Sequence, residues 1–208
     1  MSDTTRTKQL IKNVLIDLCQ TQSFRKISVQ KIANEAKINR QTFYYHFTDK
    51  YDLLRWVYCE DALHYLDPQC LSLDNWEEQA LKMLKAIAEK KEFYANTVLS
   101  DPEILQKEFS QLIQKSFIKI FEQMDEERQL SARDKLFYAR FFSYGCSGVL
   151  VNWITNEYEE TPMEIAMQLF RLAKDTELYS YRLYAKEELE EQLSLIHISE
   201  PTRLDVIS

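Results

Sequence analysis

The sequence predicts an all-α protein, and three observations support this fold class. The 208-residue chain contains only 2 glycines and 4 prolines, whereas sheet proteins need many turn residues. Apolar residues recur at helical spacing from the first segment onward. Ser, Thr, Asn and Asp stand at several positions where a helix would begin, as N-cap residues do. We therefore expect about nine helices, in one compact domain or two small ones.

Four of these helices are expected before Pro68. The apolar positions between Leu10 and Leu18 predict the first, and the next three begin at suitable N-caps, which are Ser28, Asn39 and Asp49. The expected spans are residues 5–21, 28–36, 40–47 and 49–67. A tight connection at 37–39 joins the second helix to the third.

Five helices are expected after Pro68, and all but a short one at 92–99 are long. Asp101-Pro102 combines an N-cap with a proline at the first helical position, and Ser131 begins the next helix. Thr161 and Glu164 form a capping box. The expected spans are residues 74–90, 92–99, 102–127, 131–157 and 162 to beyond 183.

Composition gives no sign of a membrane protein or a secreted one. No run of 18 apolar residues is present, and residues 1–5 are polar, unlike the core of a signal peptide. The cysteines form no Cys-x-x-Cys pair, and no histidine stands at metal-ligand spacing from them; they are Cys19, Cys59, Cys70 and Cys146. We expect a cytoplasmic protein with reduced cysteines, no metal and no cofactor.

Charge is divided unevenly along the chain. Residues 1–50 contain nine Lys or Arg and four acidic residues, a net charge of +5, whereas the rest carries −12. A basic head on an acidic body can bind phosphate at one end and repel it elsewhere. Chance variation in surface charge is the alternative explanation.

Residues 27–54 have the pattern of a helix-turn-helix, in which the second helix enters the major groove of DNA. Arg40 has two donors for guanine, Gln41 can pair with adenine, and Thr42 can contact a thymine methyl or a phosphate. The other candidates for DNA contact are Ser28, Gln30 and Asn39, and four residues with groups suited to phosphates, which are Tyr44, Tyr45, His46 and Lys50.

The aromatic residues of this second helix divide into two groups. Phe43 and Phe47 are spaced by four, so we expect them to pack together against Ile32 and the first helix. An aromatic core cluster is the alternative for the others. Three consecutive residues, Tyr44 to His46, cannot all point inward on so short a helix, so we expect them to face DNA.

These residues resemble the TetR family of regulators. The matching positions are Ile32-Ala33, Glu35-Ala36, Ile38, Thr42 to Phe47, Lys50 and Leu53-Leu54. The resemblance implies a three-helix DNA-binding head, a helical ligand-binding body and a dimer formed by the last two long helices. One position departs from the family pattern: Lys37 stands where glycine is usual, and glycine accepts a left-handed backbone more readily.

Beyond residue 55 the resemblance is fainter. Residues 142–154 are similar to a TetR subset that includes regulators of dihydroxyacetone kinase operons. Both glycines, Gly145 and Gly148, lie there inside an apolar helix, where each costs about 1 kcal/mol. A close helix crossing or a ligand cavity would offset that cost, with simple close packing as the alternative.

Six aromatic residues of the body are candidates to line a pocket for an apolar or aromatic ligand. They are Tyr94, Phe117, Tyr138, Phe141, Tyr144 and Trp153. Core packing is the alternative for each, because aromatics at helical spacing usually pack internally.

Residues 193–208 interrupt the helical pattern, and 193–203 resemble the translation of a sequencing-library adapter. We expect a non-native or disordered tail there. The predicted organisation is a helix-turn-helix domain at 1–50 with its motif at 28–47, a helical ligand-binding and dimerisation domain at 51–192, and this tail.

The predicted function is that of a homodimeric, sequence-specific regulator that binds double-stranded DNA. We expect a repressor released by a small-molecule effector. One alternative is an activator working with a ligand-sensing partner protein, and another is a helical interaction module without DNA binding. No Gly-rich phosphate loop or Gly-x-Ser-x-Gly elbow is present, so we expect no enzyme and no catalytic residues.

Overall fold

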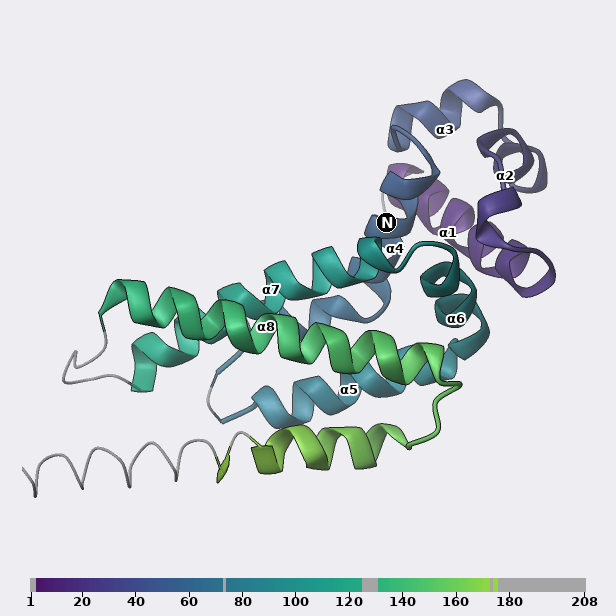
Figure 1. Ribbon diagram of the computed structural model, residues 1–208. Helices are drawn as coiled ribbons and strands as arrows, with labels where there is room; N and C mark the ends of the chain where they lie inside the picture. Colours follow the sequence, from purple (N-terminus) through teal and green to yellow (C-terminus); the bar gives the residue numbers. More distant parts are fainter. Residues whose placement is uncertain (1–2, 73, 125–130, 173, 176–208) are drawn as a thin grey trace, which may run out of the picture. The chain divides into compact units, whose positions relative to one another are not determined.

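The computed structural model describes residues 3–72, 74–124, 131–172 and 174–175 (Figure 1). All regular secondary structure in these residues is helical, which confirms the predicted fold class. Contacts divide the chain into two compact units, residues 1–166 and 167–208. The second unit is helical at 167–172 and 174–175. The rest of the last predicted helix and the tail at 193–208 lie outside the described residues.

The N-terminal head begins each of its later helices at a predicted cap. Ser28 Oγ accepts a hydrogen bond from Lys31 N at 3.2 Å, and Asn39 Oδ1 accepts one from Thr42 N at 2.6 Å. Asp49 Oδ1 accepts from the amide of Tyr51 at 2.7 Å. The elements are α1 (Asp3–Thr21), the 3-10 turn η1 (Phe24–Lys26), α2 (Val29–Glu35), α3 (Arg40–His46) and α4 (Lys50–Asp61). Of these five elements, only η1 was not predicted from the sequence.

The body consists of the elements that follow α4. They are the 3-10 turn η2 (Leu63–Leu66), α5 (Trp76–Glu89), α6 (Lys91–Ser100), α7 (Pro102–Met124), α8 (Ala132–Thr155) and a helix at 162–172. The predicted capping box is present, since Thr161 N donates to Glu164 Oε2 at 2.8 Å and Glu164 N donates to Thr161 Oγ1 at 3.2 Å. The fourth helix ends at Asp61, earlier than predicted, because η2 follows it.

Helices α7 and α8 run antiparallel and side by side (Figure 1). Phe117 and Phe142 stack between them, with ring centroids 5.3 Å apart. Helix α6 contacts α1 of the head as well as α7 and α8, so it links head and body. None of the helices in the described residues combines the length and apolar character needed to span a bilayer.

The turn between α2 and α3 contains the predicted left-handed residue. Lys37 has φ 53°, and the amide of Ile38 donates to Ala33 O at 3.0 Å across the turn. A side chain in this conformation is unfavourable by about 1 kcal/mol relative to glycine.

Lys37→Gly is therefore expected to raise the free energy of unfolding by about 0.5–1 kcal/mol. The gain is the relieved backbone strain less the extra freedom that glycine has in the unfolded chain. Urea unfolding followed by circular dichroism would measure it. Lys37→Ala is the matched control, because it removes the same charge and keeps the strain. An equal effect of both variants would contradict this account.

Candidate nucleic-acid interface

Helix α3 is anchored by its two phenylalanines. Phe43 is 0% exposed and Phe47 is 3% exposed, and Ile32 of α2 is also fully buried. The rings of Phe43 and Phe47 lie 5.9 Å apart, and Phe47 also contacts Trp56 of α4 at 5.5 Å. The predicted anchoring of α3 by its phenylalanines is therefore confirmed.

The opposite face of α3 is open to solvent. Tyr44 is 45% exposed and Tyr45 is 78% exposed. Arg40 and Gln41 are also exposed, whereas Thr42 and His46 are half-buried. Donors, acceptors and aromatic rings thus share one accessible helix face, and side chains of these types can pair with base edges in a major groove.

Arg40 and Tyr44 form a pair one helical turn apart. Arg40 Nη2 donates to Tyr44 Oη at 2.9 Å, and the guanidinium carbon lies 5.3 Å from the centroid of the same ring. This pairing limits the rotamers of a long, exposed side chain. At the end of α3, burial lowers the pKa of His46, and the charge of Lys8 lowers it further, so the imidazole is neutral at pH 7.

Three of the predicted contact residues also have local structural roles. Ser28 and Asn39 are the N-caps of α2 and α3, and Thr42 Oγ1 donates to Asn39 Oδ1 at 3.0 Å. Gln30 is exposed on α2 and donates to Asn34 Oδ1 at 2.8 Å. Ser28 and Asn39 thus fix the first turns of the two helices.

The prediction that Lys50 contacts a phosphate disagrees with the structure. Lys50 Nζ donates to Phe24 O at 2.9 Å, Arg25 O at 3.1 Å and Ile27 O at 2.9 Å, and it lies 4.7 Å from the Phe24 ring centroid. An ammonium group has three donors, and all three are occupied. Burial lowers the pKa of Lys50, with an opposing effect of Cys19. The residue therefore holds η1 in place.

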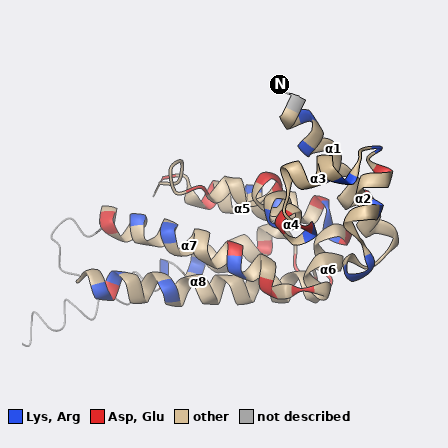
Figure 2. Ribbon diagram, turned by 90° about the horizontal axis from the view of Figure 1, so that it is seen from above, with Lys and Arg blue, Asp and Glu red and all other residues tan. Residues whose placement is uncertain are grey.

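Basic residues are distributed over the head. Figure 2 shows Lys and Arg positions along α1 and α2. The exposed cations outside α3 include Arg6, Lys26, Lys31 and Lys37. They supply the net positive charge that was predicted for residues 1–50, and this charge favours approach of a phosphate backbone.

Helix α6 holds the end of α1 through one amide. Asn96 Nδ2 donates to Cys19 O at 2.5 Å and to Gln22 O at 2.9 Å, and Asn96 Oδ1 accepts from Phe24 N at 2.9 Å. Arg25 Nε also donates to Ser100 O at 2.8 Å. Sequence reasoning missed these contacts, because their partners are backbone groups more than 70 residues away.

The six aromatic residues proposed to line a ligand pocket differ in their surroundings. Tyr94 and Trp153 are fully buried, and their polar atoms donate to Asp61 Oδ2 at 3.2 Å and Glu160 O at 2.8 Å. Phe117 stacks within the α7–α8 pair. The other three are exposed on α8: Tyr138 by 38%, Phe141 by 65% and Tyr144 by 61%.

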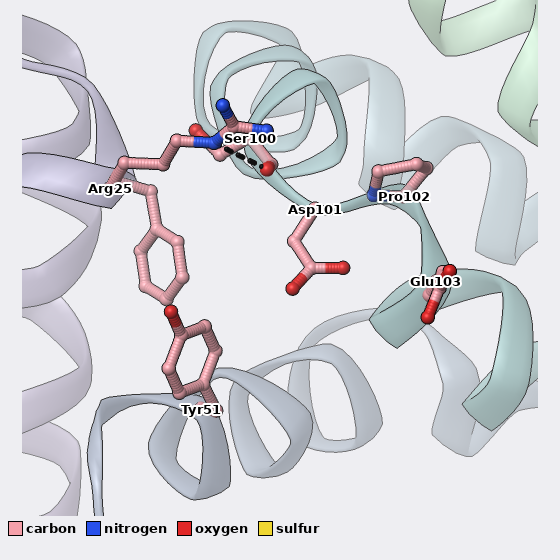
Figure 3. A pocket seen from close by; sticks show the side chains of 7 residues that line it. Arg25, Tyr51, Ser100, Asp101, Pro102 and Glu103 are labelled. Atoms are coloured by element: carbon pink, nitrogen blue, oxygen red, sulfur yellow. Dashed lines mark hydrogen bonds between the residues drawn. The ribbon is translucent and has the colours of Figure 1, made fainter.

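A cavity of about 470 Å³ lies instead where the head meets the body. Figure 3 shows the carboxylate of Asp101 directed into it, with Arg25 and Tyr51 on the side of the head. Ser100, Pro102 and Glu103 complete the opposite side. Phe24 also lines the cavity. None of the six predicted aromatics lines this cavity.

Two models of known protein families match this chain, one in the head and one in the body. Residues 15–57 match the family model described as bacterial regulatory proteins of the tetR family. Residues 74–175 match a model described as a transcriptional regulator C-terminal region. The two matched segments correspond to the head and the body.

Individual relatives agree with this division. The HTH-type dhaKLM operon transcriptional activator DhaS of Lactococcus lactis subsp. lactis (strain IL1403) is 30% identical over 95 residues, which cover 46% of this chain and 50% of that protein. The match thus spans half the length of this relative. A solved structure of the dihydroxyacetone kinase operon activator DhaS is 22% identical, with a TM-score of 0.64 over 82% of this chain and 95% of that one.

A TetR transcriptional regulator from Streptococcus agalactiae 2603V is similar as well. Its structure is 26% identical, with a TM-score of 0.55 over 80% of this chain and 92% of that one. With one family model on the head, another on the body and these relatives, the chain belongs to the TetR family of transcriptional regulators.

Proposed function

We propose that this chain is a sequence-specific DNA-binding regulator that acts as a homodimer. The observation that carries the proposal is the division of α3 into two faces. Phe43 and Phe47 are buried, while Arg40, Gln41 and Tyr44 are exposed on a helix that follows a capped turn. Such a helix can enter a major groove without losing its own packing. The basic head supplies the accompanying attraction to phosphate.

The outer face of α8 supports a homodimer. Phe137 and Phe141 are 53% and 65% exposed, and Tyr144 is 61% exposed, one or two turns further on. Among the residues that the structure describes, no side chain outside the immediate chain neighbours lies within 4 Å of a Cβ built on Gly145 or Gly148. An exposed apolar stripe of this kind usually marks an interface, and glycine lets a second helix approach closely. We propose that a second copy covers it.

Phe141→Glu combined with Tyr144→Glu is expected to convert the dimer to a monomer. The two-fold symmetry of a homodimer places four carboxylates in the interface, where each loses hydration without gaining a partner. Light scattering after size exclusion would measure the mass, and operator affinity would fall by more than about tenfold. Gln111→Glu, at an exposed position on α7, is the matched control. A double variant that remains dimeric would show that this stripe is not the interface.

The DNA that the chain binds is the first thing to test. A gel shift with the region upstream of its own gene, at two salt concentrations, is expected to give a complex of dimer size that weakens steeply with salt. Two heads about 34 Å apart would then contact successive turns of the major groove. If this region gives no specific complex, selection of bound fragments from the whole genome follows. Failure of both would leave a helical interaction module as the better description.

The direction of regulation has two candidates. The first candidate is a repressor that a small-molecule effector releases from DNA. In this case the helical body would have two conformations, one preferred by the effector and the other by DNA. The L. lactis relative and the protein of the DhaS structure are both described as activators, which favours the second candidate. A ligand-sensing partner protein would then supply the signal. Transcription of a reporter behind the bound DNA, with and without this chain, distinguishes the two, because its loss raises transcription only for a repressor.

We further propose that the chain acts in the cytoplasm, where its operator is located, and that it catalyses no reaction. Of the four cysteines, Cys19 is buried, and burial raises the pKa of its thiol to about 12. A thiol of this kind is a poor nucleophile. Burial likewise raises the pKa of the Cys146 thiol to about 11.

A further inference from the structure

A buried carboxylate lies where α1 of the head meets the body. Asp61, the last residue of α4, has a side chain that is 2% exposed. Its Oδ1 lies 3.2 Å from Lys12 Nζ of α1, and the same oxygen accepts a hydrogen bond from Lys90 Nζ. Its other oxygen, Oδ2, accepts from the hydroxyl of Tyr94 at 3.2 Å. One side chain thus joins the head, the α5–α6 junction and α6.

The three charges of this cluster do not balance. A buried carboxylate needs a paired cation, and one lysine would be sufficient. Here two ammonium groups bind the same oxygen, so they lie close together and repel each other. They differ in position as well: the side chain of Lys12 is 13% exposed and that of Lys90 is 36% exposed. Lys12 comes from the head and Lys90 from the body.

We propose that Asp61 is a positioning residue through which the body holds α1, and that Lys90 competes with Lys12 for its charge. When Lys90 is close, the Lys12 pair is weakened by repulsion, and α1 is held less firmly. When Lys90 moves away, Asp61 binds Lys12 alone, and α1 is held more firmly. The effect of this competition on DNA affinity rests on the proposed function. Its effect on how firmly α1 is held does not.

The surroundings of the cluster link Lys90 to the start of α6. Tyr94 stacks on Tyr58 of α4, with ring centroids 5.5 Å apart, and Tyr58 Oη donates to Thr97 Oγ1 at 2.7 Å. A shift of this part of α6 therefore moves Lys90 and Tyr94 together. The bonds of Asn96 to the end of α1 lie further along α6 and do not involve Asp61. The charge cluster can loosen while that contact stays closed.

Hydrogen exchange of the DNA-free protein tests the competition, because its prediction has opposite signs for the two lysines. Lys12→Met is expected to speed amide exchange in α1, since α1 loses its link to Asp61. Lys90→Met is expected to slow exchange there, since the repulsion is removed. Lys12→Arg, which keeps the charge, and Lys85→Met, at an exposed position on α5, are the controls. Faster exchange in both lysine-to-methionine variants would overturn the proposal, because the lysines would then only stabilise the fold together.

The affinity of the same variants for operator DNA tests whether the competition at Asp61 affects DNA binding. Lys12→Met is expected to weaken binding by about two- to thirtyfold at every salt concentration, with an unchanged salt slope. A direct phosphate contact would instead reduce that slope by about 1. Lys90→Met is expected to leave binding equal or stronger. A reduced slope for Lys12→Met would show that Lys12 contacts DNA and is not a positioning residue.

The two proposals fail in different ways. If the wild-type chain binds no specific DNA, the proposed function is lost, but opposite exchange effects in the free protein would still support the competition at Asp61. If DNA is bound and both variants exchange faster, only the competition is lost. Asp61→Asn is less informative alone, because it leaves the mostly buried Lys12 ammonium group and its neighbour Lys90 without an anion and is expected to destabilise the head.

Discussion

Replacing Arg40 by alanine is expected to relax the choice of base at one position of the operator by about 1–3 kcal/mol. The exposed guanidinium can donate two hydrogen bonds to a guanine, and no neutral side chain replaces them. Its pairing with Tyr44, at 2.9 Å, limits its rotamers before DNA arrives, so less freedom is lost on binding. Gln41→Ala is expected to have an effect of the same size at a different base, since Gln41 is exposed one residue further along α3.

Competition binding against operators with single base changes would measure these effects. The wild-type chain should discriminate at the contacted position, and the variant should bind all four bases with similar affinity. Tyr44→Ala is the informative comparison, because a loss of phosphate contact weakens binding to every sequence equally and lowers the salt slope. If the Arg40 and Gln41 variants kept the full base preference, α3 would not be the recognition helix.

Lys50→Met is expected to lower the free energy of unfolding by about 2–4 kcal/mol. The ammonium group donates to three backbone carbonyls of residues 24–27, and hydrogen bonds to a charged group contribute more than neutral ones. Methionine keeps the length and the contact with Phe24 but leaves the three carbonyls without this donor. Because η1 leads directly into α2, its loss should loosen the helix-turn-helix.

Thermal or urea unfolding would measure the loss of stability in Lys50→Met. DNA binding at temperatures or urea concentrations below the unfolding transition would show whether Lys50 acts through the fold or through a contact with DNA. Bound fractions corrected for unfolding should have the wild-type salt slope, since the structure uses all three donors of Lys50 internally. Lys26→Met, an exposed lysine of the same turn, is the matched control and should leave stability nearly unchanged. A Lys50 variant of wild-type stability with a smaller salt slope would restore the phosphate contact predicted from the sequence.

The sequence alone determined the helical architecture and the division of α3 into a buried and an exposed face. Helix starts were predicted because a cap is a local interaction: Ser28, Asn39 and Asp49 bond amides two or three residues away. The buried positions of Phe43 and Phe47 followed from a spacing of four on one helix. The left-handed turn at Lys37 followed from a family pattern that is itself a backbone requirement. Each of these predictions depends on a few consecutive residues.

Only the tertiary structure decided what long side chains and remote pairs do. Lys50 looked like a surface cation, and its role became clear when residues 24–27 were found around its ammonium group. The body aromatics shared helical spacing, yet Trp153 is buried and Tyr144 is exposed, because faces of different helices meet different neighbours. Asp61 joined Lys12 and Lys90, which lie 49 residues before and 29 residues after it. Such contacts depend on how helices pack, and helix packing is not encoded in any short segment.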